Sequence, residues 1–179
     1  MSDGARRPPD TVLDWARRYV AAGLSVIPVR RGGGKAPAFA GWRDYSDRLA
    51  TDDELAGWFT GDRYGIGITG GKASGNLAVI DFEFKGGMDG WAVWKADLSV
   101  RLAGLAAGCP TVLTPSGGRH VYVRLSEQAP GGVLARTEGG LTLIEVRGDG
   151  NFVVAPGSPA DCHKTNTPYT FESMGWLTW

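Results

Sequence analysis

Two carboxylates, Asp81 and Glu83, follow the apolar run of residues 77–80 and are the clearest candidates for chemistry in this sequence. Such a run predicts a buried strand, and alternate residues of a strand point to the same face, with Cα atoms roughly 6.5 to 7 Å apart. Two buried like charges are unfavourable unless a cation lies between them. Oxygen ligands favour Mg²⁺ or Mn²⁺, so the pair predicts a metal site. The alternative is a half-exposed sheet on which both side chains face solvent.

A second segment combines a glycine turn with two basic side chains. Residues 112–113 and 121–124 predict two strands, and the Ser-Gly-Gly sequence of residues 116–118 predicts the tight turn that joins them. Glycine allows backbone N–H groups to approach an anion closely. Arg119 and His120 follow the turn and add side-chain donors. The segment therefore predicts an anion-binding turn, and the alternative is an ordinary hairpin with a surface histidine.

A third carboxylate, Glu145, lies inside another apolar run, residues 143–146. Arg147 follows two residues later, on the same face of the expected strand. Taken alone, this arrangement is interpreted as a surface ion pair of little energetic consequence. Its significance comes from its place after the first two segments.

These three segments, in this order, resemble the bifunctional DNA primase–polymerase (prim-pol) domain of the archaeo-eukaryotic primase superfamily. In that family a strand ends in D-x-D or D-x-E, a turn carries S-G-G-x-H, and a later strand carries a third acidic residue before R-G-x-G. The resemblance runs from about residue 11 to residue 171, and the order of the motifs makes it more specific than any one of them. The matching positions are Asp81, Glu83, Ser116, Gly117, Gly118, His120, Glu145 and Arg147.

The expected fold is α+β: an RRM-like core with a mixed or antiparallel sheet backed by helices, and an additional αβ unit beside it. The alternation of expected elements favours this core, and the resemblance implies the same. Asp10, Thr51 with Glu54, and Asp89 are expected to cap three helices. The expected helices span residues 10–22, 51–59 and 90–107, and the expected strands span residues 24–29, 64–69 and 77–83 and further segments after residue 111.

The resemblance implies the activity of a DNA primase and DNA polymerase. A 3′-hydroxyl would attack the α-phosphorus of a dNTP or an rNTP on a single-stranded DNA template, in a two-metal nucleotidyl transfer. Asp81, Glu83 and Glu145 would be the catalytic metal ligands for Mg²⁺ or Mn²⁺. Because the second and third acidic positions are both Glu, which is one methylene longer than Asp, the preferred metal and the catalytic efficiency stay open.

The resemblance also implies how the nucleotide is bound. His120 would donate to a triphosphate oxygen, and the turn at residues 116–118 would add backbone or hydroxyl contacts. Arg147 would neutralise developing charge on the phosphates. Arg119 and Lys35 are the next candidates for phosphate or template contacts, and each is equally well interpreted as a simple surface residue.

Two other functions compete with this interpretation. The first is a non-catalytic module that binds single-stranded nucleic acid or nucleotide, and the filled acidic and histidine positions argue against it. The sequence also lacks the aromatic sheet motif of an RNA-binding RRM. The second is a metal-dependent nuclease, which also uses clustered carboxylates and two metals. A labelled primer separates the two chemistries, because polymerisation lengthens it and nuclease action shortens it.

Composition sets limits on partners and cofactors. The 179 residues carry no formal net charge, so nucleic-acid binding requires a local basic patch. The two cysteines cannot form a disulfide framework. Cys162 and His163 adjoin each other without a second ligand pair, so no structural zinc is expected. No signal peptide or transmembrane stretch is evident, which predicts a cytoplasmic protein without a membrane partner.

The expected organisation is a flexible tail over residues 1–9 and one prim-pol catalytic domain over residues 10–179. The resemblance implies a setting in the replication of a plasmid, phage or other mobile element. Because the family is often fused to a helicase, the chain is interpreted either as a fragment of a longer primase–helicase or as a protein that acts beside a separate helicase.

Overall fold

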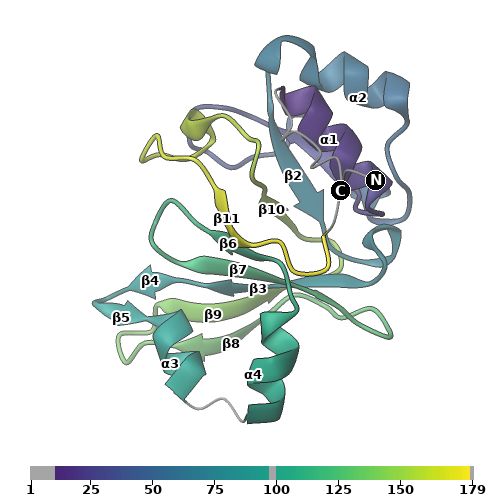
Figure 1. The fold of residues 1–179 in the computed structure, drawn as a ribbon. Coiled ribbons are helices and arrows are strands. Elements are labelled where there is room, and N and C mark those ends of the chain that lie inside the picture. Colours follow the sequence, from purple (N-terminus) through teal and green to yellow (C-terminus); the bar gives the residue numbers. More distant parts are fainter. Residues whose placement is uncertain (1–10, 97–99, 178–179) are drawn as a thin grey trace, which may run out of the picture.

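The computed structural model describes residues 11–96 and 100–177, which form two antiparallel sheets with helices on their outer sides (Figure 1). The smaller sheet has the order β1-β2-β10, the larger one β11-β6-β7-β3-β9-β8, and β4 and β5 form a short hairpin. The helices are α1 (Val12–Ala21), η1 (Ala40–Ser46), α2 (Asp52–Phe59), η2 (Thr60–Asp62), η3 (Lys72–Ser74), α3 (Gly90–Ala96), α4 (Val100–Ala107) and η4 (Ala160–Cys162). The strands are β1 (Val26–Val29), β2 (Gly65–Thr69), β3 (Leu77–Phe82), β4 (Phe84–Lys85), β5 (Met88–Asp89), β6 (Thr111–Leu113), β7 (Arg119–Arg124), β8 (Gly132–Arg136), β9 (Thr142–Arg147), β10 (Phe152–Val154) and β11 (Thr170–Ser173).

The chain crosses between the two sheets three times, from β2 to β3, from β9 to β10 and from β10 to β11. One hydrophobic core fills the space between α1, α2 and both sheets, and includes Tyr19, Ile68, Val79 and Tyr122. Burial of such large side chains is the main favourable contribution to folding. The two sheets are therefore fixed against each other by a shared core as well as by the chain itself.

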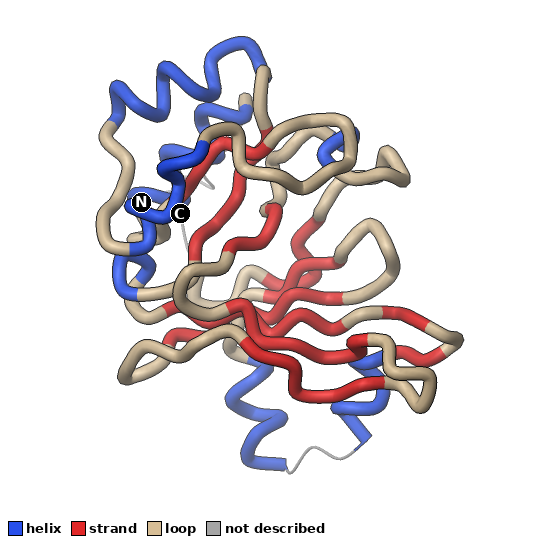
Figure 2. Tube along the Cα trace, turned by 180° about the vertical axis from the view of Figure 1, so that it is seen from behind, coloured by secondary structure: helices blue, strands red, loops and turns tan. Residues whose placement is uncertain are grey.

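A second, smaller core lies on the other face of the larger sheet. Phe82, Val121, Leu143 and Ile144 form it, and the α3 side chains Trp91 and Trp94 pack against it. Seen from behind in Figure 2, the helices lie on the outer sides of the two sheets. One face of the larger sheet is thus covered by α3, and the other face meets the smaller sheet.

The prediction of an α+β protein with an antiparallel sheet backed by helices is confirmed, and the small sheet with α1 and α2 forms an additional αβ unit. The capping box at α2 is also confirmed: the Glu54 N–H donates to Thr51 Oγ1, and the Thr51 N–H donates to Glu54 Oε2. The cap expected for the first helix was wrong. Thr11 caps α1, because its hydroxyl accepts from the Asp14 N–H and completes a capping box. Asp10 lies outside the described residues.

The single helix expected over residues 90–107 is two helices, α3 and α4. Asp89 caps the first, because its Oδ1 accepts from the Trp91 N–H at 2.9 Å. A single helix over residues 90–107 would place Trp91, Leu98 and Leu105 on one apolar side. In the structure Trp91 packs beneath the sheet, whereas Leu105 is 63% exposed. Leu98 lies outside the described residues.

Candidate active site

Strand β3 carries Asp81 to the middle of the larger sheet, between β7 and β9. In the strand register Asp81 lies opposite His120 of β7 and opposite Glu145 of β9. Residues directly opposite each other on neighbouring strands share a face of the sheet. Glu83 follows the end of β3, where its N–H donates to the Leu143 carbonyl at 2.9 Å. Pairing of three strands thus gathers side chains that are far apart in the sequence.

The three carboxylates expected to bind metal meet on this face. Asp81, Glu83 and Glu145 each offer an oxygen, and these oxygens lie within 4.8 Å of one another. Within residues 11–96 and 100–177, this is the one cluster of acidic, histidine or cysteine side chains with such spacing. A ligand set of carboxylate oxygens suits hard divalent cations such as Mg²⁺ and Mn²⁺.

The environment of Asp81 also fits a bound cation. The residue is 8% exposed. Burial and then the neighbouring Glu83 carboxylate raise the pKa of Asp81 to about 6, although Arg147 opposes them. A buried carboxylate that ionises with difficulty gains most from a nearby positive charge. The structure therefore places the acidic cluster where a divalent ion would relieve an electrostatic cost.

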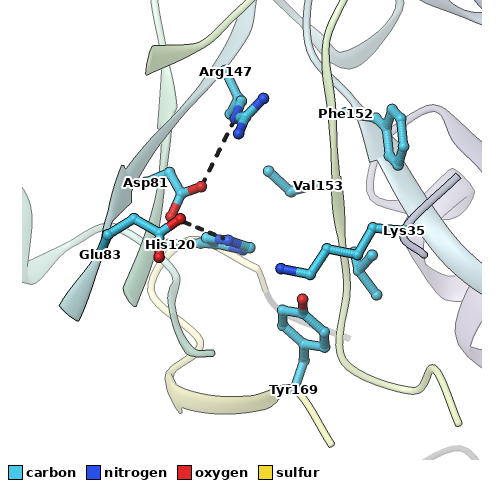
Figure 3. A pocket seen from close by; sticks show the side chains of 9 residues that line it. Lys35, Asp81, Glu83, His120, Arg147, Phe152, Val153 and Tyr169 are labelled. Carbon is cyan, nitrogen blue, oxygen red and sulfur yellow. Dashed lines mark ion pairs between the residues drawn. The ribbon is translucent and has the colours of Figure 1, made fainter. Parts of the chain in front are cut away.

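A cavity of about 200 Å³ opens in front of the carboxylates. Figure 3 shows Lys35 and Tyr169 on the side of the cavity opposite Asp81 and Glu83. Strand β10 of the smaller sheet contributes one wall, so the cavity lies between the two sheets. Its other lining residues are His120, Arg147, Phe152, Val153 and Val154.

Two cations that line the cavity approach the carboxylates from different elements. Arg147 donates from Nη2 to Glu145, and its Nε lies 3.8 Å from Asp81 Oδ2. Lys35 comes from the loop after β1, and its Nζ lies 5.9 Å from the centre of the Tyr169 ring. Desolvation lowers the pKa of the Lys35 ammonium group, against the attraction of the carboxylates. The geometry brings both residues to the place where the sequence predicted phosphate contacts, and their binding roles stay predictions.

His120 is a buried, neutral ring beside Asp81. Its Nε2 lies 3.6 Å from Asp81 Oδ1, and its ring stacks on Tyr169 with centres 5.8 Å apart. Desolvation, followed by the nearby Lys35 charge, lowers the pKa of His120 to about 3. Its Nδ1 is buried and has no hydrogen-bond partner among the described residues. Because a buried N–H donor without a partner is costly, we assign the proton to Nε2, which faces the carboxylates.

The expected turn at residues 116–118 joins β6 to β7 and touches the end of β3. The Gly117 N–H donates to the Thr114 carbonyl, and Gly117 has a φ of +87°. A Cβ at Gly118 would lie 2.0 Å from the Phe82 carbonyl oxygen. Glycine is thus required for close packing against β3. Ser116 lines a neighbouring cavity, together with Glu83.

Arg119 lies away from the carboxylates. It pairs with Phe82 in the strand register, so it belongs to the face covered by α3. Its guanidinium group makes two hydrogen bonds to Glu172, at 2.8 and 2.9 Å, and lies 5.3 Å from the Trp91 ring centre. Adjacent residues of a strand face opposite sides, so His120 and Arg119 cannot both reach the same cavity. The structure does not bring Arg119 to the candidate site.

Sequence reasoning missed two residues near the site. Tyr169 lines the main cavity, and nothing in its sequence context marked it. His163 lines the neighbouring cavity and was considered only as a zinc ligand beside Cys162. Cys162 is fully buried and packs against Gly65. A Cβ added at Gly65 would lie 2.3 Å from the Cys162 Sγ atom.

An antiparallel α+β fold with three carboxylates facing basic side chains defines a class of proteins that can bring divalent cations and phosphates together. The sequence matches the family described as bifunctional DNA primase/polymerase, N-terminal, over residues 16–175. The chain belongs to this family, which confirms the resemblance found from its motifs. Membership supports DNA primase/polymerase activity of the nucleotidyltransferase type, with DNA and nucleotides as substrates.

No curated protein matches this sequence significantly. In the part of the chain that the structure describes, none of the helices has the length and apolar character to cross a membrane.

Proposed function

We propose that this domain joins nucleotides from dNTP or rNTP to a 3′-hydroxyl on a single-stranded DNA template. The proposal is carried by the cluster of three carboxylates, because two of its members, Asp81 and Glu83, line one cavity together with Lys35 and Arg147. The carboxylates fit divalent ions, and the two cations fit the phosphates of a nucleotide. Such a combination is what a nucleotidyl transfer requires, because charge develops on the transferred phosphate and on the leaving pyrophosphate.

The residues of the chain have distinct roles in this proposal. Asp81, Glu83 and Glu145 would hold Mg²⁺ or Mn²⁺, which when bound supplies Lewis acidity to the attacking hydroxyl and the leaving oxygen. His120 donates from Nε2 to an oxygen of the triphosphate, as a neutral ring. Arg147 exchanges its contacts with Glu145 and Asp81 for the nucleotide phosphates, so its charge is available when the substrate arrives.

Two alternatives give different products. A binding module without chemistry has no need of a buried, poorly compensated Asp81, because that carboxylate lowers stability when it is ionised. A metal-dependent nuclease could use the same acidic cluster. The cations beside the carboxylates, Lys35 and Arg147, favour a ligand with several phosphates over a single phosphodiester. We propose that the domain acts in the replication of a plasmid, phage or other mobile element, together with a helicase.

The test is extension of a labelled primer on a single-stranded template, with Mg²⁺ or Mn²⁺ and with dNTP or rNTP. The Asp81→Asn variant runs beside the wild type, together with a reaction that lacks primer. Asp52→Asn is the matched control, because it removes an exposed carboxylate of α2 that pairs with Arg17 of α1. Such a surface ion pair contributes about 0–1 kcal/mol.

Longer products from wild type and Asp52→Asn, with none from Asp81→Asn, would support the proposal. Products without primer would add primase activity to it. Shortened primers would identify a nuclease instead. An unchanged primer with every metal and nucleotide, from a folded protein that binds DNA, would favour the binding module.

A further inference from the structure

A second cavity, of about 370 Å³, adjoins the first and shares Lys35 and Glu83 with it. Its walls come from the loop after β1, the start of β4, the glycine turn and the loop that follows η4. The side chains that matter for its chemistry are Lys35, Glu83, Lys85, Ser116, His163 and Lys164.

The charge of this second cavity is positive. Three ammonium groups line it, from Lys35, Lys85 and Lys164, against the carboxylate of Glu83. Lys85 Nζ lies 3.1 Å from Glu83 Oε1, so that pair is largely neutralised. The charges of Lys35 and Lys164 are left to face the cavity. A concave surface with excess charge of one sign concentrates ligands of the opposite sign, so this cavity suits an anion.

His163 adds a directed donor. The residue is 3% exposed, and its Nδ1 accepts a hydrogen bond from the Thr165 N–H at 3.2 Å. Because Nδ1 accepts and desolvation lowers the pKa of this ring, the neutral imidazole carries its proton on Nε2. This Nε2–H has one contact among the described residues, with Ser116 Oγ at 3.5 Å, which is long for a hydrogen bond. The ring therefore presents an N–H group that a ligand oxygen could satisfy better.

The two loops that carry Lys35 and Lys164 are joined to each other before any ligand binds. The N–H groups of Gly32 and Gly33 both donate to the Asp161 carbonyl at 2.9 Å, and Gly34 pairs with His163 as an isolated antiparallel bridge. A Cβ at Gly33 would lie 2.9 Å from the Lys164 backbone. The glycine run thus allows the loops to pack backbone against backbone, and the cations are presented from a preorganised wall.

We propose that this second cavity binds the β- and γ-phosphates of the incoming nucleoside triphosphate, with His163 as an N–H donor and Lys164 as a counter-charge. The inference rests on the proposed function, because the acidic cluster in the adjoining cavity fixes where the α-phosphate reacts. Lys35 and Glu83 belong to both cavities, so the path from the α-phosphate to the terminal phosphates is continuous. His163 and Lys164 are thereby nucleotide-binding residues in addition to the motif positions.

The test measures binding of dTTP, dTDP and dTMP by calorimetry, with Ca²⁺ in place of the reactive metal. The variants are Lys164→Met, His163→Leu and His163→Gln, whose amide keeps an N–H donor. Lys72→Met is the control, because Lys72 is an exposed lysine on η3 that is not among the lining residues of either cavity. We expect Lys164→Met and His163→Leu to bind dTTP about tenfold more weakly. The loss of one charge-assisted hydrogen bond lowers affinity by about that factor.

The same two variants should bind dTMP as wild type does, and His163→Gln should recover most of the dTTP affinity. Equal losses for dTMP and dTTP, or unchanged dTTP affinity in Lys164→Met, would overturn the assignment. Lys164 is exposed, so this variant tests the proposal even where His163→Leu fails to fold. If the wild type extends primers but the Lys164 and His163 variants bind dTTP as tightly as the wild type, the phosphate-binding role of the second cavity is refuted and the polymerase function is not. If affinity rises from dTMP to dTTP and depends on Lys164 and His163, but no primer is extended, the polymerase function is refuted and the phosphate-binding role of the second cavity is supported.

Discussion

The imidazole Nε2 of His120 lies 3.6 Å from Oδ1 of Asp81, across a register pair of two central strands. At that distance the two groups are close without a strong hydrogen bond. Both are buried, and burial moves both toward neutrality: the pKa of Asp81 rises to about 6, and that of His120 falls to about 3. A bound cation would favour the ionised form of Asp81, and a phosphate oxygen would accept a hydrogen bond from His120, so the two ligands would act on neighbouring groups.

Replacement of Asp81 by Asn should stabilise the metal-free protein at pH 7.5. The folded-state pKa of about 6 lies above the ordinary value of 3.8, so the stability contributed by protonated Asp81 is lost as the pH rises through 6. This difference corresponds to at most about 3 kcal/mol, and we expect a gain of about 1–3 kcal/mol. Urea unfolding in EDTA measures it, and the gain should vanish below about pH 4. A less stable Asn variant at pH 7.5 would contradict this account.

Added Mg²⁺ or Mn²⁺ should make the wild type more stable than Asp81→Asn, which reverses their order of stability in EDTA. A ligand that binds the folded state raises its stability, by about 2.7 kcal/mol at a hundred times its Kd. Wild type should therefore gain melting temperature with metal, whereas Asp81→Asn should gain little. Asp52→Asn should respond as wild type does, since its carboxylate pairs with Arg17 outside the acidic cluster. Equal shifts in wild type and Asp81→Asn would place the metal elsewhere.

His120 should not titrate near neutral pH. Desolvation is the leading cause that lowers the pKa of both His120 and His163. Since the ordinary value of 6.5 applies in the unfolded chain, stability from neutral His120 is complete above pH 6.5 and is lost as the pH falls toward 3. The ring nitrogens of His120, assigned with His120→Gln, should keep the ¹⁵N chemical shifts of a neutral imidazole from pH 8 to pH 5, whereas the titration of Asp81 beside it moves the ring signals only slightly. Conversion to the ¹⁵N shifts of an imidazolium with a midpoint near 6.5 would show a solvated ring.

Gly118→Ala should destabilise the protein and weaken nucleotide binding. Its Cβ would lie 2.0 Å from the Phe82 carbonyl oxygen, a backbone atom at the end of β3 that cannot move aside easily. Overpacking of this kind costs about 1–3 kcal/mol. Gly132→Ala is the matched control, because no atom lies within 4 Å of a Cβ at that position. Chemical unfolding of both variants measures the difference, and equal stabilities would show that the turn can move away from β3.

Arg147→Met should lower activity strongly, whereas Arg119→Met should change it little. Arg147 faces Asp81 and Glu145 in the cavity, so its loss should lower kcat/KM for the nucleotide by about 10²-fold. Arg119 is held by Glu172 on the opposite face of the sheet, so its loss should change kcat/KM less than about threefold. Steady-state primer extension compares them. A large loss in Arg119→Met with normal folding would show that the template reaches that face.

Much of the site was predictable from the sequence, because local strand geometry fixes which neighbours share a face. Asp81 and Glu83 lie two residues apart, and so do Glu145 and Arg147, and each pair points to one side. The same alternation argues against Arg119 once His120 is assigned to the cavity. The capping box of α2 was likewise local, since it needs only Thr51 and Glu54 at their spacing.

The tertiary structure alone decided which side chains meet. The register that sets Asp81 between His120 and Glu145 depends on the pairing of strands separated by long stretches of chain, and a shift of one residue would turn either partner to the other face. The sequence by itself determined the chemical types on each strand. It did not determine that Lys35 and His163 lie opposite them, because those positions come from loops fixed by backbone packing and a shared core, not by any local periodicity.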